Sequence, residues 1–170
     1  VVKPAAGKLG DINSITSIAN SNKTEASIGK FGVGFKAVFQ YTSTPHIYDP
    51  NVHFRIDRFI VPILLEDDFK GRKANETLFV FPFDHTERNQ EEAYSDIAEK
   101  LKALSYPLLF LSNLRNIDFE FEDVIGLYGK YVSETRQFGD STAEFITLTQ
   151  NSGDDIVDQH LWLFTRKDEA

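Results

Sequence analysis

Residues 28–36 read Ile-Gly-Lys-Phe-Gly-Val-Gly-Phe-Lys and run directly into 35–41, a stretch whose composition is typical of a helix. Three glycines within six residues let backbone N–H groups approach an anion without a Cβ in the way. The first turn of a following helix adds unpaired N–H donors and the positive end of its dipole. Lys30 and Lys36 add mobile positive charge. The sequence therefore predicts a phosphate-binding loop, named here the glycine loop, over residues 28–36.

The segment before the glycine loop predicts a helix and a lid. Residues 11–20 begin with a plausible N-cap, Asp11, and place Ile12, Ile15 and Ala19 on one apolar stripe. Residues 21–27 are small and polar throughout, and such a segment cannot bury enough apolar surface to be rigid by itself. We expect a short amphipathic helix followed by a mobile flap in front of the glycine loop.

The glycines allow three other interpretations. A tight turn before a helix is the simplest one. A P-loop requires Gly-Lys-Ser/Thr at its end, whereas Phe35 and Lys36 follow Gly34 here. The dinucleotide fingerprint G-x-G-x-x-G/A matches residues 32–37, with Asp57 at a suitable distance to meet a ribose hydroxyl. A dinucleotide site needs a buried apolar strand before the first glycine, and residues 24–28 do not provide one. NAD binding is the weaker alternative.

Residues 17–21 and 28–35 together resemble the GHKL ATPases, which include heat-shock chaperone ATPases, gyrase B, MutL and histidine kinases. The similarity is greatest to chaperone-like and sacsin-like proteins, in which an Ile-Gly-x-Phe-Gly-Val-Gly-Phe loop follows a lid and binds the phosphates of ATP. It continues at residues 75–83, where the family has Gly-Thr entering a core strand and the threonine takes part in adenine recognition. Thr77 matches that threonine, while Glu76 replaces the glycine. The similarity covers residues 11–112.

The resemblance implies ATP and Mg²⁺ as ligands. It implies that backbone N–H groups of the glycine loop and the Lys30 side chain contact the phosphates. It also implies that Lys23 lies on the lid and that Thr77 takes part in adenine recognition. The ATP-binding set is Lys23, Gly29, Lys30, Phe31, Gly32, Val33, Gly34, Phe35 and Thr77. No catalytic residue and no metal ligand is assigned, because the family's glutamate base, magnesium-binding asparagine and adenine-reading aspartate precede the lid. Residues 1–10 contain no acidic residue, and the chain contains no methionine, so we expect a piece of a larger protein.

The remaining pattern predicts an α+β fold. Residues 52–57 alternate at period two and 77–83 are continuously apolar, as in strands of a mixed sheet. Helices are expected over 91–104 and, as a short buried one, 107–113. Four further strand patterns follow, at 117–122, 128–132, 144–149 and 159–165. The resemblance implies that residues 1–112 are part of a Bergerat-type α/β sandwich, a mixed, mainly antiparallel sheet with helices on one face. Residues 113–170 would form a β-rich extension or the start of a second domain.

The composition of the chain disfavours several classes of functional site. A net charge of −8 disfavours a nucleic-acid surface, which needs a concentrated basic face. The absence of cysteine excludes thiolate chemistry and fits a cytoplasmic location. The four histidines lack zinc-site spacing, and no G-x-S-x-G nucleophile motif is present. The charged residues 66–76 are typical of a solvated loop rather than a metal site. No apolar run is long enough to span a membrane.

These observations lead to one main hypothesis and two alternatives. The parent protein is expected to bind Mg-ATP and hydrolyse it slowly, using lid closure as a conformational signal, while the fragment alone is inactive. This chain would supply the lid and the phosphate loop. Its expected partners are ATP and the remainder of its own polypeptide, with a homodimer allowed and no nucleic acid or membrane. The main alternative is a non-catalytic protein-interaction module that keeps the GHKL fold, and the weaker one is a dinucleotide-binding fragment.

Overall fold

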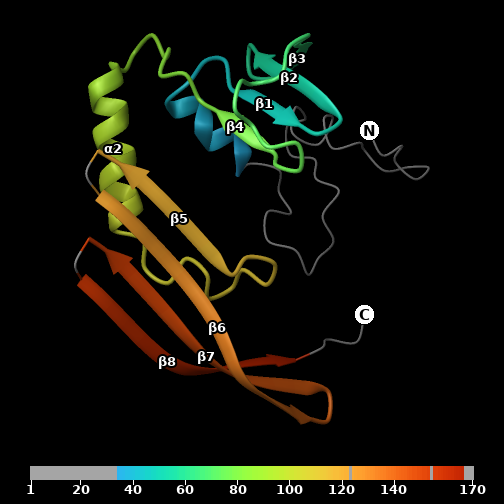
Figure 1. Cartoon of the computed structure of the whole chain (residues 1–170), viewed down its shortest axis with the longest axis vertical. Helices are drawn as coiled ribbons and strands as arrows, with labels where there is room; N and C mark the ends of the chain where they lie inside the picture. Colours follow the sequence, from blue (N-terminus) through green and yellow to red (C-terminus); the bar gives the residue numbers. More distant parts are fainter. Residues whose placement is uncertain (1–33, 123, 154, 167–170) are drawn as a thin grey trace. The chain divides into compact units, whose positions relative to one another are not determined.

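The computed structural model describes residues 34–122, 124–153 and 155–166 (Figure 1). The chain forms two compact units, the first ending at Ser95 and the second beginning at Asp96. Each unit contains one four-stranded sheet, and every strand pair in the described residues is antiparallel. The expected antiparallel character is therefore confirmed, and parallel pairing is not seen in the ranges described. The expected domain boundary at residue 112 stays a prediction, as do the helix at 11–20 and the lid, which lie outside the described residues.

The described part of the first unit contains a short helix before a sheet with strand order β3-β2-β1-β4. Its elements are the 3-10 helix η1 (Phe35–Gln40), β1 (His46–Asp49), β2 (Val52–Asp57), β3 (Val61–Leu64) and β4 (Leu78–Val80). The helix expected over 35–41 is thus present as a 3-10 helix. The strand expected over 52–57 is confirmed as β2. The strand expected over 77–83 is shorter than predicted, since β4 ends before Pro82, which has no N–H for a sheet ladder.

The core of the first unit forms where η1 packs on the sheet. Phe54 and Ile56 alternate with polar residues along β2, so both point to the same face, and Ile47 of β1 joins them. Phe39 of η1 completes this buried cluster. Burying four large apolar side chains together is the main stabilising contribution that these residues can make. It also fixes η1, and with it the C-terminal end of the glycine loop.

The turn between β2 and β3 has an unusual backbone. Arg58 and Phe59 both have positive φ, 50° and 66°, a conformation that hairpin turns usually give to Gly or Asn. Two contacts from η1 accompany it: the Lys36 Nζ donates a hydrogen bond to the Phe59 carbonyl at 2.7 Å, and the Phe39 and Phe59 rings lie 4.8 Å apart. The Lys36 ammonium, which the sequence predicts to supply mobile charge, is hydrogen-bonded at this turn.

Helix α2 (Gln90–Lys102) crosses the boundary between the two units. Asn89 caps it, since its side-chain oxygen accepts a hydrogen bond from the Glu92 N–H at 2.8 Å. Acidic residues in the first turn and lysines in the last complement the helix dipole. The helix expected over 91–104 is thus confirmed, although it begins and ends slightly earlier.

The second unit is a sheet of long strands in the order β5-β6-β7-β8 (Figure 1). The strands are β5 (Asn116–Phe121), β6 (Val124–Phe138), β7 (Ser141–Ser152) and β8 (Asp155–Arg166). All four expected strands of the β-rich tail are confirmed, and the last three are longer than predicted. The buried cluster of this unit is Leu108, Phe119, Phe121, Tyr128, Ile146 and Leu148. Leu101, at the end of α2, packs against it.

The short helix predicted over 107–113 is wrong. This segment consists of turns, with backbone hydrogen bonds from the Leu109 N–H to Tyr106 and from the Leu111 N–H to Leu108. The carbonyls of Leu108 and Leu111 instead accept hydrogen bonds from the buried Lys130 Nζ, each at 3.0 Å. A side chain of β6 therefore satisfies carbonyl groups that a helix would have satisfied internally.

None of the helices in the described ranges is both long and apolar enough to cross a membrane.

Candidate functional site

Most of the predicted ATP-binding residues lie outside the part of the chain that the structure describes. These residues are Lys23, Gly29, Lys30, Phe31, Gly32 and Val33. The three that are described, Gly34, Phe35 and Thr77, all belong to the first unit.

Gly34 stands at the junction of the glycine loop and η1. Its φ and ψ are −59° and −47°, and its carbonyl accepts the Ala37 N–H at 3.2 Å, so the helical turn begins here. A Cβ built on Gly34 meets no atom of the described residues within 4 Å. The Phe35 ring packs 6.0 Å from that of Phe79 in β4 and 6.4 Å from that of Phe81. The junction is therefore attached to β4 through Phe35, and among the described residues no atom crowds Gly34.

Thr77 directly precedes β4, at the entry of the strand that the sequence predicts, and its side chain is exposed. Its hydroxyl donates a hydrogen bond of 3.1 Å to an oxygen of the Asp49 carboxylate. The same carboxylate accepts a hydrogen bond from the Asn51 backbone N–H, which is the main reason why the pKa of Asp49 is lowered. Thr77 and Phe35 thus lie at the same strand, Thr77 before its first residue and Phe35 against its middle.

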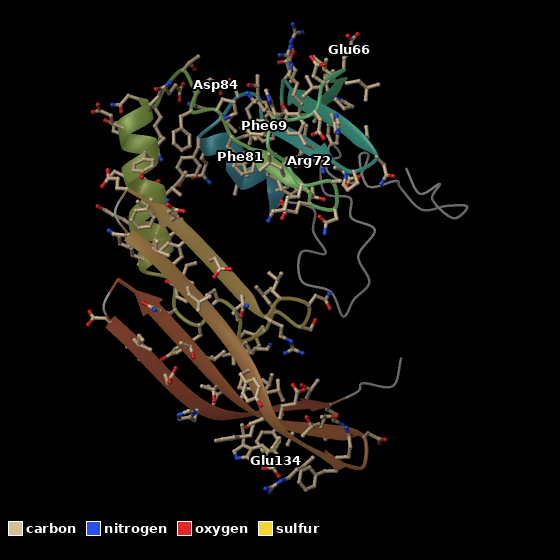
Figure 2. All side chains as sticks on the ribbon, in the orientation of Figure 1. Glu66, Phe69, Arg72, Phe81, Asp84 and Glu134 are labelled. Atoms are coloured by element: carbon tan, nitrogen blue, oxygen red, sulfur yellow. The ribbon has the colours of Figure 1, made fainter. Side chains whose placement is uncertain are left out.

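Asp84 links the end of η1 to the segment that follows β4 (Figure 2). Its carboxylate accepts hydrogen bonds from the Thr42 hydroxyl at 3.1 Å, the Ser43 N–H at 2.6 Å and the Thr44 hydroxyl at 2.6 Å. Partial burial raises the pKa of Asp84, but these three hydrogen bonds outweigh it and the net pKa is lowered. We call these three hydrogen bonds the Asp84 clamp. Because Thr42 is fully buried, the Asp84 clamp fixes the connection from η1 to β1.

We predict that Asp84→Asn destabilises the first unit by about 1–2 kcal/mol at neutral pH, since an amide accepts fewer of these hydrogen bonds. The folded pKa is lowered, so the stabilisation is present above the ordinary pKa of 3.8 and is lost as the pH falls through the folded pKa. Urea unfolding followed by circular dichroism at several pH values tests this. The matched control is Asp67→Asn in the exposed loop that follows β3. A variant as stable as the wild type at pH 7 contradicts the role of the clamp.

A groove of about 450 Å³ lies beside η1 in the first unit. It is lined by Lys36, Phe39, Gln40, Phe59, His85, Glu87 and Arg88. The Arg88 guanidinium lies 5.0 Å from the centre of the Tyr41 ring. The pKa of Lys36 is lowered because the ammonium is partly buried. Sequence patterns could not reveal this groove, since its residues come from three separate segments.

The charged loop over residues 66–76 is organised by one arginine (Figure 2). Arg72 pairs with both oxygens of Asp68, at 2.7 and 2.6 Å, and donates to the carbonyls of Lys73 and Glu76. The hydrogen bond from Arg72 lowers the pKa of Asp68 to about 2. Within the described ranges, no three His, Asp or Glu side chains are grouped as they would be around a metal ion.

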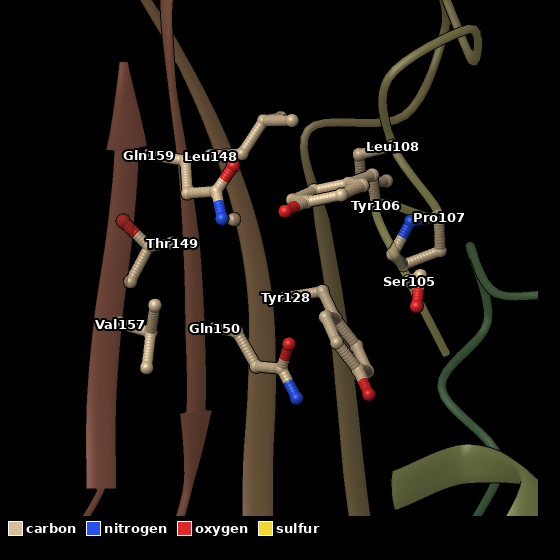
Figure 3. A pocket seen from close by; sticks show the side chains of 11 residues that line it. Ser105, Tyr106, Pro107, Leu108, Tyr128, Leu148, Thr149, Gln150, Val157 and Gln159 are labelled. Carbon is tan, nitrogen blue, oxygen red and sulfur yellow. The ribbon is translucent and has the colours of Figure 1, made fainter. Parts of the chain in front are cut away.

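The second unit has a small pocket of about 110 Å³ between the 105–108 segment and the sheet (Figure 3). Tyr106, Tyr128, Gln150 and Gln159 give it a mixed aromatic and amide lining. The Tyr128 hydroxyl donates to the Leu101 carbonyl at 2.6 Å, and burial raises the pKa of this phenol. All of its described lining residues belong to the second unit.

No family model, no curated protein and no solved structure matches the chain.

Proposed function

We propose that this chain forms part of an ATP-binding site of the GHKL type, in which the glycine loop holds the phosphates and β4 lies at the rear of the pocket. The observation that carries the proposal is the junction at Gly34. There a Cβ on Gly34 would meet no atom of the described residues within 4 Å, while Phe35 packs on β4. Glycine at such a junction lets a phosphate approach the backbone N–H groups closely.

The surroundings of the junction favour a preorganised site. Phe39 anchors η1 in the core, and the Asp84 clamp holds the segment that follows it. Binding energy is then not spent on ordering this wall of the pocket. We further propose that the first unit is part of a Bergerat-type sandwich with helices on one face of its sheet. The GHKL resemblance places the magnesium ligand and the general base upstream of the lid, so ATP hydrolysis is proposed for the parent protein.

The dinucleotide alternative receives less support. It makes Asp57 a ribose-binding acid at the end of a parallel strand. In the structure Asp57 ends β2, which pairs antiparallel with both β1 and β3. Its carboxylate lies 3.9 Å from the Arg58 guanidinium. The interaction-module alternative shares the fold and differs only in lacking ATP binding, so a binding experiment distinguishes it.

The test is a titration of the ¹⁵N-labelled chain with Mg-ATP, followed by NMR. We expect weak binding, with a Kd on the order of 1 mM, and amide shifts at Gly34, Phe35 and Thr77 but not in the second unit. Gly34→Ala is the informative variant. Its helical φ and ψ suit alanine and its surroundings accept a Cβ, so the fold is kept while the added methyl meets the phosphate. We expect at least a tenfold loss of affinity, and a larger one for Gly34→Val.

Parallel titrations decide between the alternatives. NAD binding that is lost in Asp57→Ala contradicts the ATP proposal and supports the dinucleotide site. Absence of shifts with either nucleotide supports the interaction module. ATP binding that Gly34→Ala leaves unchanged removes the glycine loop from the site.

A separate prediction concerns Thr77. Thr77→Val keeps the β-branched shape but removes the hydroxyl, and we expect it to weaken ATP binding by about 1 kcal/mol, the net value of one hydrogen bond. The fold should persist, because the residue is exposed and its bond to Asp49 lies at the surface. The matched control is Thr165→Val in the second unit. Wild-type affinity in Thr77→Val refutes the role in adenine recognition.

A further inference from the structure

The four outermost strands of the two sheets differ in how well they are protected against pairing with another chain. β3 contains Pro62, β4 has only 3 residues, and β5 has 6 residues with exposed Asp118 and Glu120. Prolines, shortness and charges are the usual means of blocking an edge. β8 has 12 residues, contains neither proline nor lysine, and pairs with β7 in continuous register from end to end. Although β8 carries Asp155, Asp158 and Arg166, its length and regular pairing make it the least protected of the four.

β8 also exposes large apolar side chains. In the described part of the chain its neighbour is β7 alone (Figure 1). Val157 is 53% exposed, Ile156 66% and Phe164 70%. A long, regular edge strand with exposed apolar residues presents a row of backbone N–H and C=O groups together with a surface that gains from burial.

We propose that β8 is a homodimerisation edge, at which two copies of the chain pair their β8 strands antiparallel about a two-fold axis through His160. The second-unit sheets of the two copies then form one continuous sheet. A second copy fits because a two-fold interface is self-complementary. Backbone hydrogen bonds would supply affinity and the side chains would fix the register.

The register follows from the faces of the strand. Leu161 and Leu163 pack against the core of the unit, so the odd-numbered residues of β8 face inward and the even-numbered ones face outward. A two-fold axis perpendicular to the sheet keeps each face on the same side, so paired residues must share a face. Centring the axis on His160 places Ile156 opposite Phe164 of the second copy, and Val157 opposite Leu163. Centring it on Leu161 would place Ile156 opposite Arg166 instead.

Charge complementarity supports the same register. Asp155 and Asp158 lie in the first half of β8 and Arg166 ends the second, so antiparallel pairing brings the acidic half of one copy to the basic half of the other. Asp158 comes opposite Trp162 of the second copy. The ring of Trp162 carries the Arg136 guanidinium 4.7 Å from its centre. Arg136 is itself paired with Glu134 at 2.6 Å, so the charge contribution comes mainly from the acidic and basic halves of the strand.

The second half of β6 is an alternative edge. β5 pairs with β6 only as far as Gly129, so the residues beyond have no β5 partner. A register shift between Val132 and Glu134 interrupts this stretch, and it carries charged residues. Such a bulge twists an edge away from further pairing. β8 therefore remains the better surface.

A charge-swap series measured by sedimentation equilibrium tests the proposal. We expect the wild-type chain to dimerise with a Kd in the micromolar range, on the order of 10 µM. Ile156→Lys with Phe164→Lys places like charges opposite each other twice, and we expect dimerisation to weaken at least about tenfold. Ile156→Lys with Phe164→Glu places opposite charges there and should restore it to within roughly threefold of the wild type. The control is Ile125→Lys, an equally exposed position at the start of β6.

These positions are exposed, so the variants should fold, and circular dichroism checks that they do. A wild-type chain that remains monomeric at about 100 µM overturns the proposal, and this includes the case in which a different partner covers β8. A dimer that is indifferent to the double lysine substitution, or that the opposite-charge pair does not restore, overturns it as well.

Disulfide cross-linking tests the register independently, because the chain contains no cysteine. In His160→Cys the two introduced thiols face each other across the axis, within the Cα separation that a disulfide accepts. We expect rapid formation of a cross-linked dimer under mild oxidation. Asp158→Cys is the control, since its thiol lies opposite Trp162. Equal cross-linking of both variants contradicts the proposed register.

Discussion

Replacing Gly126 by alanine is expected to destabilise the second unit by about 3 kcal/mol or more, the upper range for forcing extra atoms into a packed core. Gly126 of β6 lies directly opposite Phe119 of β5. A Cβ at this position would collide with the ring carbons of Phe119. The ring cannot easily move away, because it stacks on Phe121 at 5.6 Å and packs against Tyr128 at 5.7 Å. The glycine is therefore required by the aromatic ring that covers it.

Urea unfolding followed by the fluorescence of Trp162 measures this effect, since the single tryptophan lies in the affected unit. Gly129→Ala is the matched control on the same strand. A Cβ there meets Asn116 and Thr149 at 3.8 Å, an ordinary contact, so we expect a change below about 1 kcal/mol. Adding Phe119→Leu to Gly126→Ala should recover part of the loss by making room. Equal unfolding midpoints for the two glycine variants contradict the steric explanation.

The strands and the helix whose polar and apolar residues follow a regular period could be predicted from the sequence. Residues 52–57 and 117–122 alternate in polarity, and 91–104 carry a helical stripe. β3 was not predicted. The turn before it has Arg58 and Phe59 where Gly or Asn is usual, and Pro62 lies within the strand. Contacts from η1 hold that turn, and a local pattern contains no information about them.

The candidate site also has features that the sequence predicts and features that it does not. Glycine composition predicts the junction at Gly34, because backbone freedom is a local property. The Asp84 clamp joins residues 40 or more positions apart, at Thr42 and Thr44, and nothing in the local sequence around Asp84 indicates it. The groove beside η1 likewise needs the fold to bring its walls together. Tertiary contacts therefore account for what sequence patterns could not predict in both the fold and the site.

The hydrogen bonds of Lys130 account for the largest difference between the predicted and the observed fold, the replacement of the helix expected over 107–113 by turns. The Lys130 side chain is 8% exposed, and its ammonium donates to the Leu108 and Leu111 carbonyls. We predict that Lys130→Met destabilises the second unit by about 2–3 kcal/mol. Methionine fills a similar volume but leaves both carbonyls without this donor, and the relief of burying a charge offsets only part of that cost. The control is Lys100→Met on the exposed face of α2, for which we expect less than about 0.5 kcal/mol.

The pH dependence distinguishes a buried ammonium from a merely well-packed side chain. Burial lowers the pKa of Lys130, and the nearby Arg115 charge lowers it further, while Glu144 opposes them. The unfolded chain therefore binds the proton more tightly than the folded one. Stability must then rise with pH between the lowered folded pKa and the ordinary value of 10.5. We expect the stability difference between wild type and Lys130→Met to grow through this window, followed by Trp162 fluorescence in urea. A difference that stays constant as the pH rises contradicts a lowered folded pKa of Lys130, and one that shrinks shows that the hydrogen bonds to the two carbonyls favour the charged form more than burial disfavours it.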